Sequence, residues 1–164
     1  MALIFWDASG LAKRYTAETG QATVNVVFSL AGSHRLATTP SGYAETYSIL
    51  LRKLNGGVLT AASWAKAASA LQVEVVDNPD FEMLAITGED IFASILMMRR
   101  HNINSTDAAI LTLLLAYAQT PGALTCLLIA ADKRLLRAAE AEGLATLNPE
   151  AVLPADVPAL LAGL

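Results

Sequence analysis

The 164-residue chain is long enough for one domain with a substantial core, and its 54% hydrophobic and 16% charged residues exclude a disordered protein. Its formal net charge of −4 at pH 7 is unlike that of most nucleic-acid-binding proteins, which are basic. If four of the 15 acidic residues formed a metal site, the other 11 would balance the 11 Lys and Arg residues. Composition therefore neither supports nor excludes RNA as a partner.

The single cysteine, Cys126, excludes an internal disulfide and a cysteine-based zinc site, and it suits a reducing compartment. Asp7 interrupts the first apolar run, so the chain does not begin like a secretory signal peptide. The two most apolar runs, residues 108–118 and 123–131, are well short of the roughly 20 residues that a membrane helix needs. We therefore expect a cytoplasmic protein without a membrane segment.

The first predicted element is a strand over residues 2–6. Five apolar residues that end at an acid are typical of a strand buried on both faces. Asp7 follows directly, and parallel sheets bind ligands beyond the carboxyl ends of their strands. Asp7 and Ser9 are also preferred N-cap residues, so helix capping is an equally good interpretation of these two taken alone.

The remaining elements alternate along the chain. Strands are expected over residues 34–38, 124–130 and 144–147, with one more within 73–76 or 81–86. Helices are expected over residues 11–15, 21–30, 40–55, 60–71, 87–100, 103–118 and 132–143. This alternation predicts right-handed βαβ units, and hence an α/β fold with a parallel sheet between two layers of helices.

Two of these helices carry an apolar stripe at helical spacing. For residues 40–55 the stripe is Tyr43, Tyr47, Leu50, Leu51 and Leu54. For residues 87–100 two seams are expected to be core: Ile91, Ile95 and Met98, and Phe92 and Leu96. The whole chain, 1–164, is expected to form one domain. Its tail, 149–164, ends in leucines that need a surface to cover, and a dimer or partner contact is one such use.

Four carboxylates occupy similar places in these elements. Asp7 and Asp132 each follow a buried strand directly, and Asp107 lies in the first turn of an almost wholly apolar helix. Glu45 lies in the first turns of its helix, away from the apolar stripe. Each acid alone could be a cap or a solvated residue. Four together at one sheet edge are what a hard cation such as Mg²⁺ binds.

The sequence around these acids resembles the PIN-domain ribonucleases, and in particular the VapC-type toxins of toxin–antitoxin pairs. The resemblance rests on Phe-Trp-Asp-Ala-Ser-Gly-Leu-Ala-Lys from Phe5, Tyr-Ala-Glu-Thr around Glu45, Ser-Thr-Asp-Ala-Ala around Asp107 and Ala-Asp-Lys-Arg-Leu-Leu around Asp132. It spans roughly residues 3–149. Many members of the family carry Thr or Ser where this chain has Ala130.

The resemblance implies a three-layer α/β/α sandwich with a five-stranded parallel sheet in the order 3-2-1-4-5. It assigns catalysis and metal binding to Asp7, Glu45, Asp107 and Asp132, with Ser9 as a polar neighbour of the metal. It also implies an RNA substrate, a cognate antitoxin and a homodimer. The function implied is endonucleolytic hydrolysis of RNA with Mg²⁺ or Mn²⁺, which would lower the pKa of a bound water.

Neither histidine is placed to act as the base, because His34 opens a strand and His101 ends a helix. Asp7 and Asp107 are expected to be direct metal ligands. Asp132 and Glu45 would bind through water, fill a second site or help to accept the proton. The basic residues that could reach RNA phosphates are Lys13, Arg14, Arg52, Lys133 and Arg134, although each one taken alone is more typical of a solvated helix face.

Other functions fit the same pattern less well. A haloacid dehalogenase-type phosphatase needs a second aspartate where this chain has Ser9, and a receiver domain needs paired acids at the first strand. A housekeeping RNA-processing nuclease would use the same four acids. A PIN-like module that binds proteins and has lost activity is the non-enzymatic alternative, against which the complete set of acids speaks.

Overall fold

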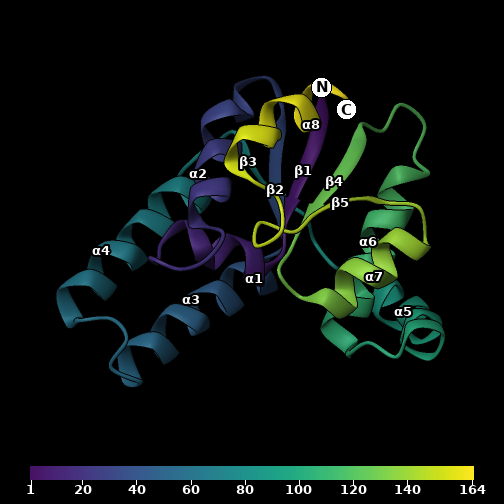
Figure 1. Cartoon of the computed structure of the whole chain (residues 1–164). Helices are drawn as coiled ribbons and strands as arrows, with labels where there is room; N and C mark the ends of the chain where they lie inside the picture. The colour runs from purple at the N-terminus through teal and green to yellow at the C-terminus, as the bar shows by residue number, and fades with distance from the viewer.

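The computed structural model describes the backbone of residues 1–164 and every side chain except that of Ser33. Five strands pair in parallel in the order β3-β2-β1-β4-β5, which confirms the predicted topology (Figure 1). The strands are β1 Ala2–Trp6, β2 Arg35–Thr38, β3 Phe81–Met83, β4 Thr125–Ile129 and β5 Ala145–Leu147. Because β1 and β4 are neighbours, the residues that follow them meet at one edge of the sheet.

Helices pack on both faces of this sheet, so the fold is the expected three-layer sandwich (Figure 1). One layer contains α1 to α4 and the C-terminal α8, and the other contains α5, α6 and α7. The helices are α1 Ala8–Leu11, α2 Gln21–Leu30, α3 Pro40–Asn55, α4 Ala61–Leu71, α5 Gly88–His101, α6 Ser105–Ala118, α7 Lys133–Ala141 and α8 Val157–Ala162.

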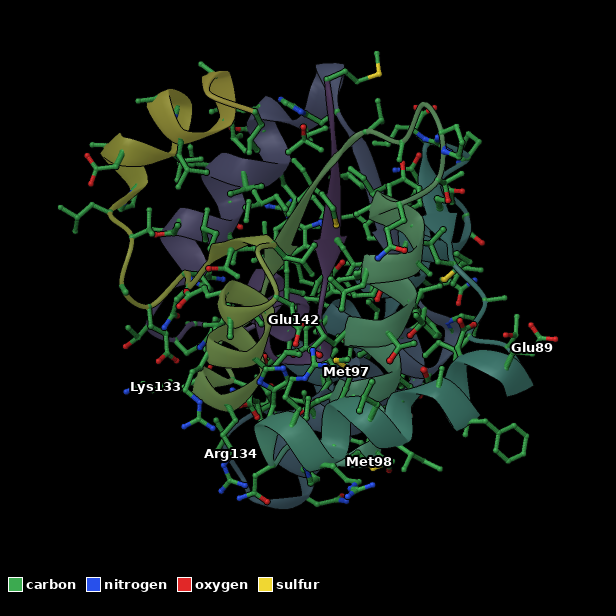
Figure 2. The ribbon with its side chains drawn as sticks, turned by 90° about the vertical axis from the view of Figure 1, so that its right-hand side faces the viewer. Glu89, Met97, Met98, Lys133, Arg134 and Glu142 are labelled. Atoms are coloured by element: carbon green, nitrogen blue, oxygen red, sulfur yellow. The ribbon has the colours of Figure 1, made fainter. Side chains whose placement is uncertain are left out.

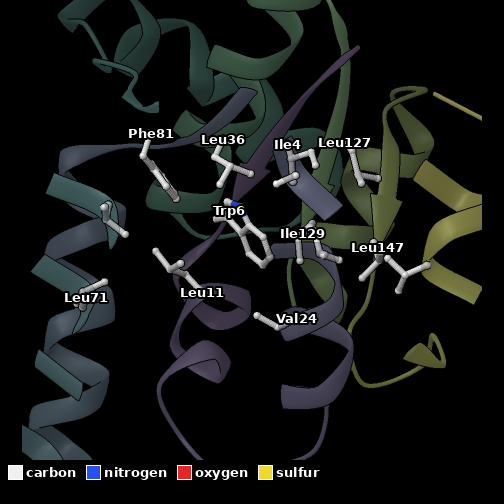
Figure 3. Close-up of a cluster of buried hydrophobic side chains, with 14 of the residues drawn as sticks. Ile4, Trp6, Leu11, Val24, Leu36, Leu71, Phe81, Leu127, Ile129 and Leu147 are labelled. Carbon is white, nitrogen blue, oxygen red and sulfur yellow. The ribbon is translucent and has the colours of Figure 1, made fainter. Parts of the chain in front are cut away.

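The central strand β1 is buried along its whole length. Successive side chains of a strand point to opposite faces, so Ile4 and Trp6 pack under α2 and α3, while Leu3 and Phe5 pack under α6 and α7. Figure 3 shows the first of these two clusters around Trp6. A strand buried on both faces explains why residues 2–6 form a continuous apolar run.

Several boundaries differ from the sequence prediction in ways that local chemistry explains. The first helix begins at Ala8 rather than at residue 11, because the Asp7 side chain caps it, and it continues as a short 3₁₀ helix, Ala12–Arg14. Residues Gln72–Val76 form a π-helical turn after α4, which leaves Phe81–Met83 as the strand. On α3 the fully buried positions are Gly42, Thr46 and Leu50, so Leu51 of the predicted stripe is exposed.

The predicted core face of α5 is wrong at four of its five residues, and only Met98 packs against the core. Ile91, Phe92, Ile95 and Leu96 are 49%, 77%, 51% and 54% exposed. The helix turns Ser94 and Met97 toward the protein instead. A helical stripe in a sequence shows that a face must be covered, but not whether this chain covers it. Phe92 and its neighbours therefore form an unpartnered apolar surface.

The tail covers this chain's own core, so we do not propose it as a partner contact. Val157 and Leu161 of α8 are buried in the cluster under α2, and Leu160 and Leu164 pack against it. The hydroxyl of Thr23 donates a hydrogen bond of 2.7 Å to the carbonyl of Val152, which ties the tail to α2.

Among the described residues, no helix combines the length and the hydropathy that crossing a membrane requires. Cys126 lies buried in β4, where burial raises the pKa of its thiol to about 12. A thiol so rarely ionised is a core residue and not a nucleophile.

Candidate active site

The carboxyl end of β1 passes directly into α1 at Asp7. The side chain of Asp7 caps the helix, with the backbone N–H of Ser9 donating 2.9 Å to Oδ2. Asp7 is only 6% exposed, and burial raises the pKa of its carboxyl group, while the hydrogen bonds from Ser9 oppose that rise. The capping interpretation of Asp7 is therefore true, and it fixes the carboxylate at the edge of the sheet.

The hydroxyl of Ser9 joins the ends of two neighbouring strands. It donates a hydrogen bond to Oδ2 of Asp7, after β1. Its oxygen accepts hydrogen bonds from the backbone N–H groups of Ala131, at 2.9 Å, and Asp132, at 3.2 Å, after β4. One side chain thus sets the distance between the loops that carry Asp7 and Asp132.

Asp132 caps α7 in the same way that Asp7 caps α1. Its Oδ1 accepts hydrogen bonds from the backbone N–H groups of Arg134, at 2.7 Å, and Leu135, at 3.3 Å. Among the described residues nothing donates to the other carboxylate oxygen, Oδ2. Asp132 therefore keeps one oxygen for the helix and leaves the second available for a ligand.

Asp107 lies in the first turn of α6 and is 9% exposed. The cap of this helix is Asn104, whose Oδ1 accepts from the backbone N–H of Asp107 and whose Nδ2 donates to Oδ2 of Asp107, both at 2.9 Å. Sequence reasoning missed Asn104, although the spacing from Asn104 to Asp107 is that of a capping box. This reciprocal pair fixes the direction of the buried carboxylate.

Glu45 is exposed on the second turn of α3 and has no hydrogen-bond or ion-pair partner among the described residues. Burial and the nearby Asp7 nevertheless raise the pKa of its carboxyl group, and Arg52 lowers it. Glu45 therefore lies near Asp7 without a hydrogen bond or ion pair to any described residue.

The four acids act on one another electrostatically. Burial raises the pKa of Asp107 to about 7, and the charges of Asp7, Asp132 and Glu45 add to that rise. Like charges raise one another's pKa because each opposes the ionisation of the next. The edge of the sheet is thus an acidic centre that favours a cation or a proton.

The possible metal ligands at this edge are of the type that a hard cation prefers. All four are carboxylates, and Mg²⁺ binds oxygen ligands, often only one or two carboxylates together with its own waters. In the described part of the chain no three His, Cys, Asp or Glu side chains converge closely enough to form a finished metal site. The chemistry of the donors fits Mg²⁺, and a bound ion would share the carboxylates with water.

Two of the five basic residues predicted to reach RNA are engaged elsewhere. Lys13 is 4% exposed, and its Nζ pairs with Glu150 at 2.7 Å. The guanidinium of Arg14 binds both carboxylate oxygens of Glu74, at 3.1 and 2.8 Å, and lies over the ring of Phe28. Both side chains stabilise the fold, so we do not include them among the residues proposed to contact RNA phosphates.

The other three basic residues are exposed near the acids. Lys133 and Arg134 belong to the first turn of α7, directly after Asp132, and their side chains extend away from the helix (Figure 2). Arg52 lies on α3, two turns beyond Glu45, where Nη1 donates to the hydroxyl of Ser48 at 2.9 Å. These positions leave cationic groups on two sides of the acidic centre.

Both histidines are occupied away from the acids. Nδ1 of His34 accepts a hydrogen bond of 3.1 Å from the backbone N–H of Ala2. Nε2 of His101 lies 2.6 Å from Glu142, which also binds Arg100 at 2.7 Å. This second cluster joins the C-terminal ends of α5 and α7, and Glu142 lies between these helices (Figure 2).

Comparison with solved structures supports the same fold. The sequence matches no protein-family model, and no curated protein matches it. The structure is similar to that of PAE2754 from Pyrobaculum aerophilum, with a TM-score of 0.62 and 18% identity over 99% of this chain and 97% of that one. It is also similar to VapC20 of Mycobacterium tuberculosis, described as a toxin that cleaves the sarcin–ricin loop, with a TM-score of 0.64 and 15% identity over 86% of this chain and 95% of that one.

These similarities extend over nearly the full length of both solved proteins, and the strand order is the one that the sequence predicted. At 18% and 15% sequence identity, these similarities establish the fold but not the activity, which has to be inferred from the residues of the site. The chain has a VapC-like PIN fold.

Proposed function

We propose that this protein is a metal-dependent endoribonuclease that hydrolyses phosphodiester bonds in single-stranded or structured RNA. The observation that carries the proposal is the acidic centre at the carboxyl edge of the sheet, where the charges of Asp7, Asp132 and Glu45 add to the raised pKa of Asp107, and Asp7 adds to that of Glu45. The likeness to VapC20, a toxin described as cleaving the sarcin–ricin loop, supports a nucleic-acid substrate, which we propose to be RNA.

The resident cofactor in this proposal is Mg²⁺ or Mn²⁺. When bound, such an ion activates water and neutralises charge on the phosphate and on the leaving oxygen. Asp7 and Asp107, the two most buried acids, would hold it directly, and Asp132 and Glu45 would hold it through water, fill a second site or help to accept the proton. Ser9 links the carboxylate of Asp7 to the backbone of Asp132 through hydrogen bonds.

The charges around the centre would position the substrate. Lys133, Arg134 and Arg52 are exposed cations that can bind phosphate oxygens of a strand crossing the acids. Because the protein as a whole is acidic, binding would depend on this local group rather than on net charge.

Cleavage of total cellular RNA by the purified protein tests the proposal. We expect discrete fragments in Mg²⁺ or Mn²⁺, no cleavage in EDTA, and a loss of about 100-fold or more for Asp107→Asn, because removing even a residue that only supports a metal ligand costs 10–100-fold. Any bound antitoxin is first removed by denaturation and refolding. Equal cleavage by the wild type and Asp107→Asn would point to a contaminating nuclease and contradict the proposed site.

We also propose that the enzyme works in the cytoplasm as the toxin of a type II toxin–antitoxin pair, with a cognate antitoxin as its protein partner. The resemblance to VapC-type proteins supports this role. Expression should arrest growth of a host cell, and Asp107→Asn should not. If the enzyme cleaves RNA but its expression does not arrest growth, a housekeeping RNA-processing nuclease would be the better interpretation. A folded protein that neither binds Mn²⁺ nor cleaves RNA would favour a binding module.

Replacing Ser9 with alanine is expected to lower the cleavage rate by about 10- to 100-fold, a cost typical of losing a group that orients a metal ligand. The change leaves the carboxylate of Asp7 without a hydroxyl donor and frees the backbone N–H groups of Ala131 and Asp132. Single-turnover cleavage at saturating Mn²⁺ measures the cleavage rate of each protein. Ser9→Thr, which keeps the hydroxyl, is the matched control, and equal loss in both variants would contradict a role for the hydrogen bonds.

A homodimer is proposed from the exposed face of α5. Glu89, Phe92, Leu96 and Arg99 recur at three- and four-residue spacing, so they lie along one side of the helix. Two copies of this face packed antiparallel about a two-fold axis would place each Glu89 opposite the other Arg99, with the apolar residues between. The face is therefore complementary to itself.

Phe92→Glu is expected to convert the dimer to a monomer at micromolar concentration, because it places a charge at the centre of this face. Light scattering during size-exclusion chromatography measures the mass. The control is Val58→Glu, which changes an apolar residue that is 71% exposed on the loop between α3 and α4. Glu89→Arg should weaken the dimer and Glu89→Arg/Arg99→Glu should restore it. A wild-type monomer would contradict the proposal.

A further inference from the structure

A groove of about 510 Å³ lies between the first turns of α3, α5 and α6, and α3 and α6 are the helices that carry Glu45 and Asp107. This volume lies within the roughly 300–1,000 Å³ that is typical of small-molecule pockets. Its apolar walls are Pro40, Ala85, Ile86, Ile91 and Ala109. No charged side chain lines it.

Three hydroxyl groups also line this groove, on Ser41, Ser105 and Thr106. The Ser41 hydroxyl lies 2.9 Å from that of Thr39. The side chains of Ser105 and Thr106 are exposed and make no hydrogen bond to any described residue. The groove thus offers flat apolar contact together with free donors and acceptors.

Its position relative to the proposed catalytic acids is fixed by the helices. Thr106 directly precedes Asp107 on α6, and Ser41 is one turn before Glu45 on α3. Residues four apart on a helix are neighbours on its surface. Ser41 and Glu45 are therefore neighbours on the surface of α3, which places the groove next to one of the four acids and within reach of a nucleotide bound there.

We propose that this groove receives one unstacked base of the RNA, beside the phosphate that is cleaved, and so sets the base preference of the enzyme. The inference rests on the proposed ribonuclease function. Sequence-specific RNA-binding proteins read splayed single-stranded bases through their edges and faces. An uncharged groove with hydroxyl groups suits a base and not a phosphate, whereas the exposed cations Lys133 and Arg134 suit the backbone.

The apolar face that contains Phe92 and Leu96 is a separate surface, because neither residue lines the groove. Only Ile91 borders both. A base in the groove is therefore compatible with a second copy on α5.

The test uses a pool of single-stranded RNA 12-mers with randomised bases, whose cleaved ends are sequenced. Wild-type protein should prefer one base at one position next to the cleaved bond. Thr106→Val, which keeps the shape and removes the hydroxyl, should change that preference by about tenfold, the cost of leaving a polar group of the base unpaired. Thr120→Val, just beyond the C-terminal end of α6, is the matched control and should leave the base preference unchanged.

A second variant tests occupancy of the groove without relying on hydrogen bonds. Ala85→Leu places a larger side chain in the groove, and it should lower kcat/KM about tenfold for the preferred RNA. It should not lower it for the same RNA with an abasic residue at that position. Circular dichroism and thermal unfolding establish that both variants are folded.

The outcomes separate the two proposals. Metal-dependent cleavage with the same base preference in the wild type and both groove variants would overturn the groove inference alone. Absence of metal-dependent cleavage by the wild type would overturn the ribonuclease function and the inference with it. A change of oligomeric mass in the groove variants, with base preference unchanged, would assign the groove to contact between copies and also overturn the inference.

Discussion

Replacing Asp107 with asparagine is expected to raise the melting temperature of the metal-free protein at pH 8 by about 5 °C or more, although it removes a proposed catalytic group. The carboxylate of Asp107 is buried among three other acids, and its pKa in the folded protein is about 7. At pH 8 it is therefore charged at an unfavourable place. An amide of the same size removes that charge, and for a chain of this length 1 kcal/mol corresponds to roughly 2–4 °C.

The sign of the pH dependence follows from the same pKa. The ordinary value of 3.8 applies to the unfolded chain, so between about pH 4 and pH 7 the folded protein holds a proton that the unfolded chain has released. The stabilising contribution of protonated Asp107 is complete below pH 4 and is lost as the pH rises through 7. The gain from Asp107→Asn should therefore be large at pH 8 and small at pH 4.

Mn²⁺ should reverse the order of the two proteins. A cation that binds the folded wild type stabilises it by roughly 2.7 kcal/mol at 100 times its dissociation constant. We expect the wild type to gain about 5–10 °C and Asp107→Asn to gain little, because its site has lost a proposed ligand. Thermal unfolding in EDTA and in Mn²⁺ measures both effects. Asp80→Asn, an exposed acid away from the site, is the control. Equal melting temperatures for the wild type and Asp107→Asn in EDTA would contradict the electrostatic account.

Replacing Gly10 with alanine is expected to destabilise the protein by about 1–3 kcal/mol, the usual cost of adding a methyl group to a packed core. A Cβ atom at this position would lie 2.8 Å from the carbonyl oxygen of Ile129. That carbonyl also accepts a 3.0 Å hydrogen bond from the backbone N–H of Asp7. Moving α1 off β4 would disturb this bond and separate Asp7 from Asp132, so cleavage should fall together with stability.

Urea unfolding measures the loss of stability, and Gly88→Ala is the matched control. Gly88 is the first residue of α5, and a Cβ atom there would meet nothing within 4 Å. Alanine is the better helix former, so Gly88→Ala should be neutral or stabilise by up to about 1 kcal/mol. A Gly10→Ala protein as stable as Gly88→Ala would show that α1 can move without cost.

The sheet was predictable from the sequence because its strands leave two strong signals. Residues 2–6 and 126–129 are apolar without interruption, which burial on both faces explains, and the acids that follow them mark the carboxyl edge. The order 3-2-1-4-5 did not come from these patterns. It came from the family resemblance, and the pairing of β1 with both β2 and β4 agrees with it.

The surfaces were less predictable, since a sequence does not say which partner covers an apolar face. Phe92 and Leu96 have the spacing of core residues and yet are exposed. Lys13 has the spacing of an exposed residue and yet is buried against Glu150, a contact between residues 137 positions apart. Such contacts depend on how distant segments pack, so local periodicity does not contain them.

Asp7 and Asp132 each begin a helix, and this double use affects how activity could be lost from such a protein over time. A lineage that no longer cleaved RNA would still be selected to keep an aspartate or another capping residue at both positions, because the fold needs them. Asp107 caps no helix, and its buried charge costs stability, so the fold does not select for it. Glu45, exposed and without a partner among the described residues, has no such protection. In descendants that have abandoned catalysis, positions 45 and 107 should therefore drift before positions 7 and 132, which makes them the more informative acids for telling active proteins from inactive ones.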